Sequence, residues 1–260
     1  MSHPIDPEAH NRRITEQFTR QAAPFAELHT VDDSVRLMMA AAQVGPADRV
    51  LDVACGPGLL ACAFAGAAAH VTGVDLTPAM LDQARRLQAA RGLTNVDWHV
   101  ADVTALPFPD GRFSVVVSRY AMHHFLEPAT VAAEMVRACA PGGRVVVADV
   151  YSTSAAQGAL YDAMERLRDP SHVRAVGREE LVGLLPALGL RGVEAQEFRF
   201  GVDVDRLLQA TGTPPDAAEQ VRRIVSDDVG HDRLGIGAHR SAGAVGFSFP
   251  VVIVSGRKPA

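Results

Sequence analysis

The stretch that decides the fold is Val50-Leu51-Asp52-Val53-Ala54-Cys55-Gly56-Pro57-Gly58, an apolar run that ends in an acid and a tight glycine turn. Apolar residues bounded by turn formers are typical of a buried parallel strand. The pattern of residues 59–65 then predicts a helix, so the turn joins a strand to a helix. Gly56 and Gly58 lack a Cβ, which lets the backbone bend sharply and lets a ligand approach it closely.

The ligand class can be narrowed from the same residues. A dinucleotide site would show Gly-x-Gly-x-x-Gly at the start of the helix, but Ala61 stands at the third glycine position. Asp52 also places a carboxylate where a pyrophosphate would bring negative charge, and like charges repel. The stretch therefore favours a ligand with an ammonium or sulfonium group. A strand, turn and helix without any ligand is the alternative.

Composition limits the class of protein. The 260 residues are 48% hydrophobic and 21% charged, which fits one domain with additions and a sizeable core. A net charge of −5 argues against a nucleic-acid partner, which would need a basic surface. The three cysteines have no metal-ligand spacing, so no metal site is expected. Without a signal segment or a membrane-length apolar run, we expect a cytoplasmic protein with no membrane span. The oligomeric state is not determined by the sequence.

Strand and helix patterns alternate after residue 45, which predicts an α/β fold with a doubly wound, mostly parallel sheet. The predicted strands are 49–53, 70–75, 96–101, 113–119, 143–149, 193–200 and 247–257. The predicted helices among them are 58–66, 78–91, 128–139, 155–168 and 178–188. Before the sheet we expect residues 1–10 to trail in solution, a helix over Asn11–His29 with Phe25 beyond a proline break, and a second helix that ends at Gln43.

Acids follow three of these strands. Asp52 ends the first, Asp75 the second, and Asp102 follows the third. Ligands of open α/β sheets bind at this carboxyl edge, where Asp75 can accept two ribose hydroxyls. Asp75 can instead act as a helix N-terminal acid. Asp102 can accept from an exocyclic amine while the N–H of Val103 donates to a ring nitrogen, although one acid at a strand end is a weak signal.

Taken together, residues 50–58, 71–75, 101–107, 113–125 and 141–143 resemble the class I S-adenosylmethionine-dependent methyltransferases. The most similar branch is the ubiquinone/menaquinone-biosynthesis type with its small-molecule relatives. The resemblance covers roughly residues 10–200 and the last strand. It implies S-adenosylmethionine as cofactor, S-adenosylhomocysteine as product, and a seven-stranded Rossmann-like sheet with an antiparallel last strand.

The resemblance also implies a domain organisation and site residues. Residues 1–45 would be an N-terminal helical cap, 46–202 and 246–260 the cofactor-binding methyltransferase domain, and 203–245 a helical lid that shapes the acceptor pocket. In similar enzymes the N-terminal helices fold over the cofactor, where an aromatic ring can attract a sulfonium. The implied cofactor contacts are Phe25 over the sulfonium; Asp52, Gly56 and Gly58 at the methionine part; Asp75 at the ribose; Leu76 and Met80 beside the adenine; Asp102 and Val103 on the adenine; and the backbone of Ser118 near the sulfonium. Ala54 stands where the family's motif has glycine, which narrows the turn slightly.

The chemistry of transfer depends on the fourth strand, which runs into His123 and His124. A histidine has a pKa near neutrality, so it can remove a proton from a hydroxyl or amine. Successive helical residues diverge by about 100°, so we expect one histidine to face the substrate and one to support the loop. Asp149 ends the neighbouring strand and can orient an imidazolium. Some O-methyltransferases that this sequence resembles carry a His-His pair and an acid at these positions. Alternatively, both histidines pack in the loop and Asp149 lies in solvent.

The function predicted is transfer of a methyl group to an O, N or C atom of a small-molecule acceptor by in-line displacement. Two alternatives are another reaction on the same fold, such as a cyclisation, and a non-catalytic binding protein. Four arginines, Arg166, Arg168, Arg174 and Arg178, cluster before the predicted lid. Most such arginines are solvated, but one or two can contact an anionic substrate.

Overall fold

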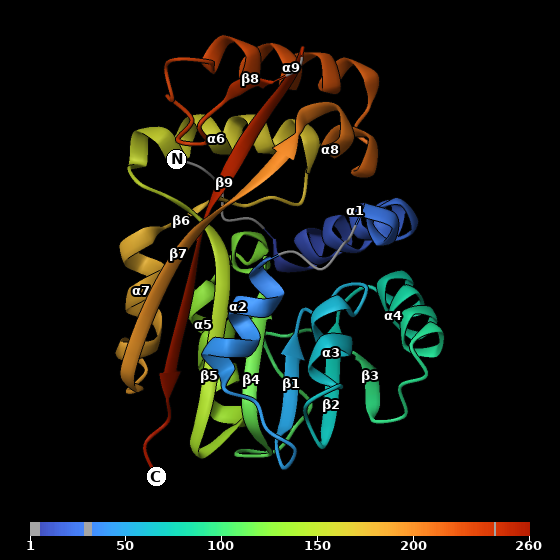
Figure 1. Ribbon diagram of the computed structural model, residues 1–260, viewed down its shortest axis with the longest axis vertical. Helices are drawn as coiled ribbons and strands as arrows, with labels where there is room; N and C mark the ends of the chain where they lie inside the picture. Colours follow the sequence, from blue (N-terminus) through green and yellow to red (C-terminus); the bar gives the residue numbers. More distant parts are fainter. Residues whose placement is uncertain (1–5, 29–32, 242) are drawn as a thin grey trace.

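The structure is a computed structural model that describes residues 6–28, 33–241 and 243–260, with the side chains of 24–28 outside the description. Seven strands form one continuous sheet in the order β3-β2-β1-β4-β5-β9-β7 (Figure 1). They are β1 (Arg49–Val53), β2 (His70–Asp75), β3 (Val96–Val100), β4 (Phe113–Arg119), β5 (Cys139–Ser152), β7 (Arg191–Asp203) and β9 (Ala244–Arg257). Two short strands pair off this path: β6 (Val176–Gly177) with β5, and β8 (His239–Ser241) with β9.

The predicted sheet is confirmed, including its one antiparallel strand. β1, β2, β3, β4 and β5 pair in parallel, and β9 runs antiparallel to both β5 and β7. The central strands read as continuous apolar runs because the sheet is covered on both faces. β3 and β7 lie at the sheet edges and carry more exposed residues, so their sequences alternate instead.

Helices cover the two faces separately. On one face, residues such as Val50 and Val117 pack against α2 (Asp33–Ala42) and α3 (Leu59–Phe64). On the other, residues such as Leu51 and Val116 pack against α5 (Pro128–Ala138) and α7 (Arg178–Ala187). Consecutive strand residues point to opposite faces, which is how Val50 and Leu51 serve different layers. α4 (Pro78–Ala90) lies beside β3 at the sheet edge.

A second layer lies beyond the carboxyl edge of the sheet. There β7 and β9 continue past the end of β5 and pair with each other as far as Asp203 and Gly246. This extension packs against α6 (Ala155–Arg168), α8 (Val204–Ala210) and α9 (Pro215–Asp228) in one apolar cluster (Figure 1). The predicted strands 193–200 and 247–257 were too short for this reason: their pairing continues into the extension.

The N-terminal helix α1 (Pro7–Leu28) corrects two expectations. Residues 7–10 do not trail in solution: backbone N–H groups of Glu8 and Ala9 approach the Asp6 carboxylate at 3.3 Å, and Pro7 occupies the first helical position. An acidic cap followed by proline is a helix start signal. The expected proline break is also absent, because α1 continues through Pro24 to Leu28. α1 lies between α4 and α8 at the side of the carboxyl edge (Figure 1).

Candidate functional site

A cavity of about 1010 Å³ lies between the carboxyl edge of the sheet, α1 and the second layer. The ends of β1 and β2 and the loops after β3 and β4 form its floor. One face of α1 closes it from the side, through residues spaced as on a helical stripe: Pro7, His10, Asn11, Ile14, Phe18 and Gln21. This is the edge at which open α/β sheets bind their ligands.

Asp52 lies at the cavity end of β1 and is 1% exposed. Its Oδ2 has no hydrogen-bond partner among the described residues. Burial raises the pKa of Asp52 to about 7, against the opposing effects of the Arg119 charge and the Ala61 N–H, and the charge of Asp75 adds to the rise. An unpaired buried carboxylate oxygen is costly. A cation or another hydrogen-bond donor in the cavity would satisfy it.

The glycine turn after β1 has three residues in the left-handed region: Ala54 with φ 56°, Gly56 with φ 52° and Gly58 with φ 78°. This conformation costs a residue with a Cβ about 1–2 kcal/mol, so Ala54 is strained rather than merely bulkier than glycine. A Cβ on Gly58 would stand 2.5 Å from the Trp98 ring, whereas one on Gly56 would meet nothing within 4 Å. Gly58 therefore lets Trp98 pack against the turn, and the missing side chain of Gly56 leaves open space at the cavity.

Asp75 is 9% exposed, and both of its oxygens accept backbone hydrogen bonds. The N–H of Gly56 donates to Oδ2 and that of Thr77 to Oδ1, each at 2.8 Å. Burial raises the pKa of Asp75, and these hydrogen bonds reduce the rise. Asp75 thus ties the turn after β1 to the start of α4. Each carboxylate oxygen can accept a further bond, and Leu76 and Met80 line the cavity beside it.

Asp102 follows β3 and is half-buried in the cavity wall next to Val103. Its Oδ1 accepts from the backbone and the hydroxyl of Thr104 at 2.9 and 2.7 Å, and its Oδ2 accepts from Asn11 Nδ2 at 2.8 Å. Burial alone would raise the pKa of Asp102, but these bonds outweigh it and the pKa is lowered. Asp102 therefore stays ionised, and Asn11 anchors α1 at this end of the cavity.

His123 lies in the short 3₁₀ helix η1 (Met122–His124) and meets Asp149 of β5. Asp149 does not end its strand as expected, because β5 continues to Ser152. Asp149 Oδ1 lies 2.6 Å from His123 Nδ1, and Asp149 is fully buried rather than in solvent. The His123 ring lines the cavity, so its Nε2 is the nitrogen free of this contact. Burial lowers the pKa of His123, but Asp149 outweighs it, so the pKa is raised.

His124 is 7% exposed and also borders the cavity, with its ring centroid 4.2 Å from that of His123. The expectation that the two histidines diverge is wrong in this respect, because the turn brings their rings together. Burial and the neighbouring His123 lower the pKa of His124 to about 3, so it is neutral. Its carbonyl accepts from His10 Nε2 at 2.7 Å, and the Phe18 ring packs edge-on against its ring. His124 is the more enclosed of the two.

Three predicted site residues do not line the cavity: Gly58, Ser118 and Asp149. The hydroxyl of buried Ser118 donates to the Val53 carbonyl at 2.9 Å and so joins β4 to β1. Asp149 reaches the site only through His123. The Phe25 side chain lies outside the described residues. The remaining predicted residues, Asp52, Ala54, Gly56, Asp75, Leu76, Met80, Asp102, Val103, His123 and His124, all line the cavity.

Several lining residues are not among those that the sequence predicts. His10 lies in the segment expected to trail in solution and Asn11 directly follows it, although Asp6-Pro7 signals a helix start. Tyr120 lies just before η1 with φ 56°, which sequence patterns do not reveal. In the second layer, α6 contributes Tyr161, Glu165 and Arg168, whose spacing of four and three residues places them on one helix face. β5, β7, β9 and α8 add apolar lining from Val150, Phe200, Val202, Leu207 and Phe249, next to the charged Asp203 and Arg206.

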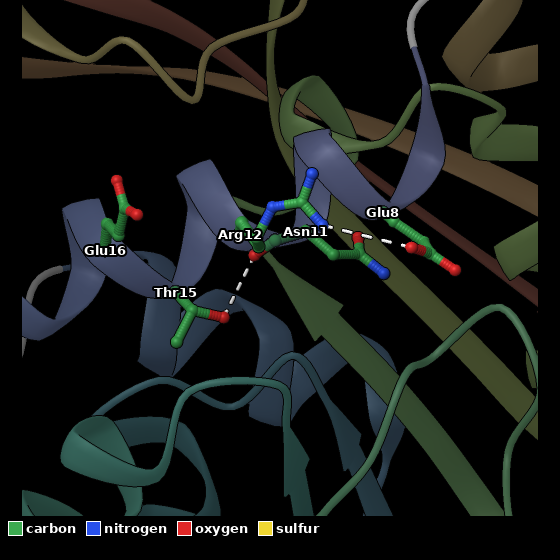
Figure 2. A pocket seen from close by; sticks show the side chains of 5 residues that line it. All are labelled: Glu8, Asn11, Arg12, Thr15 and Glu16. Carbon is green, nitrogen blue, oxygen red and sulfur yellow. Dashed lines mark hydrogen bonds and ion pairs between the residues drawn. The ribbon is translucent and has the colours of Figure 1, made fainter.

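A smaller pocket of about 440 Å³ is lined by residues of α1 alone (Figure 2). There Arg12 and Glu8 lie 3.9 Å apart and the Thr15 hydroxyl donates to the Asn11 carbonyl at 3.0 Å. Within the described ranges no cluster of metal-ligating side chains is found, and no helix has the length and apolar character to cross a membrane.

Comparison with known proteins agrees with this geometry. A family model described as a methyltransferase domain matches residues 50–143. The uncharacterized methyltransferase YcgJ of Bacillus subtilis is 28% identical over 229 residues, which cover 87% of this chain and 90% of the relative. The crystal structure of YcgJ superposes with a TM-score of 0.80 at 27% identity, over 88% of this chain and 99% of that one. The demethylmenaquinone methyltransferase of Thermus thermophilus is 45% identical over 101 residues, 38% of this chain and 46% of the relative.

The sheet order, the matched domain and the relatives agree with the methyltransferase resemblance that the sequence predicts. Residues 50–143 match a methyltransferase domain, and the chain is similar over most of its length to a methyltransferase.

Proposed function

We propose that the protein transfers the methyl group of S-adenosylmethionine to a small-molecule acceptor, with His123 as general base and Asp149 as the residue that orients it. The observation that carries this proposal is the 2.6 Å contact between His123 Nδ1 and Asp149 Oδ1 in the wall of the cavity that Asp52, Asp75 and Asp102 also border. The residues that would hold the cofactor thus border the same cavity as His123, with Asp149 behind the imidazole.

The cofactor-facing residues follow the strand order. Asp52 would hold the ammonium of the amino-acid end, Asp75 the ribose hydroxyls, and Asp102 with Val103 the adenine. Neighbouring strands lie about 4.8 Å apart, so the ends of β1 and β3 span about 10 Å, a length that suits an extended adenosyl group. The unpaired Oδ2 of Asp52 and the open space at Gly56 support this orientation.

When bound, S-adenosylmethionine would supply a methyl group on an already activated sulfonium. The main work of the chain is therefore to position the acceptor, which can be worth an effective concentration of about 10⁵ M or more. His123 adds proton removal: Asp149 accepts the Nδ1–H, which leaves the Nε2 lone pair toward the cavity. General-base help of this kind contributes about 10²–10⁴-fold.

The surrounding elements suggest a division of labour. Residues 1–45 would form a cap over the cofactor, since Asn11 contacts Asp102 and α1 closes one side of the cavity. Residues 203–245 would form the acceptor-side lid, because Asp203, Arg206 and Leu207 line the cavity from α8 and its start. The methyltransferase domain itself would comprise 46–202 and 246–260.

The test has two parts. Calorimetry with S-adenosylhomocysteine should show binding to the wild-type protein and a large loss for Asp52→Asn, because the amide cannot neutralise an ammonium. Incubation with labelled methyl donor and a metabolite extract should then yield labelled small molecules that are heavier by one methylene, and none with His123→Ala. Failure of the wild-type protein to bind S-adenosylhomocysteine, or binding without any methylated product, would contradict the proposal.

A further inference from the structure

Among the four arginines that cluster in sequence before residue 203, the structure separates one from the rest. Arg166 donates to the Val173 carbonyl at 2.5 Å, and Arg174 and Arg178 form ion pairs with Glu180 at 2.6 Å and Glu197 at 2.7 Å. These three do not line the cavity. Arg168 does, with a side chain only 12% exposed. A buried guanidinium in a ligand cavity calls for an explanation because burying a charge is costly.

Glu165 fixes the direction of Arg168. The two side chains lie one helical turn apart on α6, where Arg168 Nη2 donates to Glu165 Oε2 and Arg168 Nε lies 3.4 Å from Glu165 Oε1. Nη1 has no hydrogen-bond partner among the described residues. Burial lowers the pKa of Arg168, but Glu165 and Asp169 outweigh it and the pKa is raised, so the group keeps its charge. The guanidinium thus has one edge occupied and one nitrogen free.

Arg168 and His123 line the same cavity, and ring contacts connect their elements: the ring of Tyr161 on α6 lies 5.9 Å from that of His172, which lies 5.6 Å from that of His123. Glu165 and Asp169, the two acids that flank Arg168, are close enough to His123 to raise its pKa. Tyr161, one turn before Glu165 on the same face, lines the wall as well. Phe200 and Phe249 add apolar lining beside Tyr161, since the ring centroids of Tyr161 and Phe249 lie 6.4 Å apart. This half of the site therefore offers an apolar surface for a ring, and Arg168 and His123 as hydrogen-bond groups for an oxygen.

We infer that Arg168 binds the reacting oxygen of the acceptor as it ionises, which makes the acceptor a weakly acidic hydroxyl compound of the phenol or enol class. This inference rests on the proposed function. The acceptor O–H bond breaks and its proton goes to His123 Nε2, while the electron pair stays on an oxygen held by Arg168 Nη1. That oxygen forms a bond to the methyl carbon as the carbon–sulfur bond breaks and its electron pair returns to sulfur. The proton then leaves His123 to solvent.

Arg168 favours an oxygen acceptor over an amine. An amine attacks the methyl group in its neutral form and develops positive rather than negative charge, so it gains nothing from the guanidinium. An oxygen that becomes anionic gains from a charge-assisted hydrogen bond in a largely buried site. Arg168 is therefore a catalytic residue, and Glu165 is the positioning residue that aims it.

The probe is 4-nitrophenol, whose ionised form is visible by absorbance, added to protein saturated with S-adenosylhomocysteine. We expect the wild-type protein to bind the phenolate and to lower the apparent pKa of the bound probe. Arg168→Gln should weaken phenolate binding at least tenfold. Arg168→Lys keeps the charge but loses the planar guanidinium, so its affinity for the phenolate should lie between those of the wild type and Arg168→Gln. The matched control is Arg174→Gln, which removes an arginine outside the cavity and should bind like wild type.

Loss of Arg168 leaves Glu165 buried without its partner, so the double variant Arg168→Gln/Glu165→Gln is included to keep the charge balance. It should fold and bind S-adenosylhomocysteine as wild type does, yet lose the phenolate preference. The inference is overturned if Arg168→Gln or the double variant binds 4-nitrophenolate as tightly as wild type. It is also overturned if the wild type binds S-adenosylhomocysteine but shows no preference for the phenolate. Absence of S-adenosylhomocysteine binding, seen before the probe is added, overturns the proposed function instead.

Discussion

His123 Nδ1 and Asp149 Oδ1 lie 2.6 Å apart although 26 residues separate them in the chain. β4 and β5 pair in parallel with Arg119 opposite Ala148, so η1 and the end of β5 reach the same edge of the sheet. Asp149 also accepts backbone bonds from Val150 at 2.6 Å and His123 at 3.2 Å, which fixes the carboxylate in one orientation. The imidazole is thus oriented by a rigid group, with Nε2 left for a ligand.

The first prediction concerns this imidazole. His123→Ala should lower kcat by about a hundredfold or more, since proton removal from the acceptor is lost while the methyl donor is unaffected. Calorimetry should show unchanged affinity for S-adenosylhomocysteine. His124→Asn is the control, because His124 is neutral and enclosed. A His123→Ala enzyme with near-normal kcat would show that positioning alone accounts for catalysis.

The second prediction concerns the pH at which His123 titrates. Because Asp149 raises its pKa, His123 stays protonated to higher pH than a free histidine, and kcat should fall as pH drops through that raised pKa. Asp149→Asn removes the negative charge, so the acid limb should move to lower pH. Nuclear magnetic resonance titration of the His123 ring measures the same shift without an acceptor. An upward or absent shift in Asp149→Asn would contradict the assignment.

The third prediction uses Asp52, whose pKa burial raises to about 7. Only the ionised carboxylate can pair with the ammonium of S-adenosylhomocysteine, and the ionised fraction grows as pH rises through this value. Affinity should therefore increase between pH 6 and 8 and level off above, with up to about tenfold loss per unit below the pKa. In Asp52→Asn this dependence should disappear. Equal affinity of the wild type at pH 6 and 8 would refute the contact.

The fourth prediction concerns Asp75. Asp75→Ala should weaken binding of S-adenosylhomocysteine by about 2–3 kcal/mol, the worth of charge-assisted bonds to the ribose. The substitution also frees the N–H groups of Gly56 and Thr77, so a loss of thermal stability is expected besides. An analogue without ribose hydroxyls separates the two effects, because its affinity should fall far less. Asp82→Ala, at an exposed site on α4, should change neither quantity.

The fifth prediction compares two glycines of one turn. Gly58→Ala combines left-handed strain with a Cβ 2.5 Å from Trp98, whereas Gly56→Ala has the strain without a clash. The first should therefore lower the free energy of unfolding by about 1–3 kcal/mol more than the second. Gly56→Ala should instead reduce cofactor affinity, because Gly56 borders the cavity. Equal destabilisation by the two substitutions in chemical denaturation would contradict these separate roles.

Local sequence determined the sheet of this protein and the acids on its edge. The apolar run 50–53 can be stable only between two layers, and its turn needs left-handed residues, so strand, turn and ligand edge follow from the residues themselves. Asp52, Asp75 and Asp102 are then brought together by strand order, because parallel strands end on one side. The start of α1 is likewise signalled by local sequence, in Asp6-Pro7.

Tertiary structure alone decided which residues of the second layer line the cavity. Whether Arg166 or Arg168 faces the cavity depends on how α6 packs on the extended β7 and β9, and no spacing in the sequence specifies that packing. The strain at Ala54 and Tyr120 is likewise imposed by their surroundings. Contacts such as His10 with His124, 114 residues apart, form only once α1 lies across the finished sheet. Local residue preferences set the elements, but long-range packing sets which polar groups share a cavity.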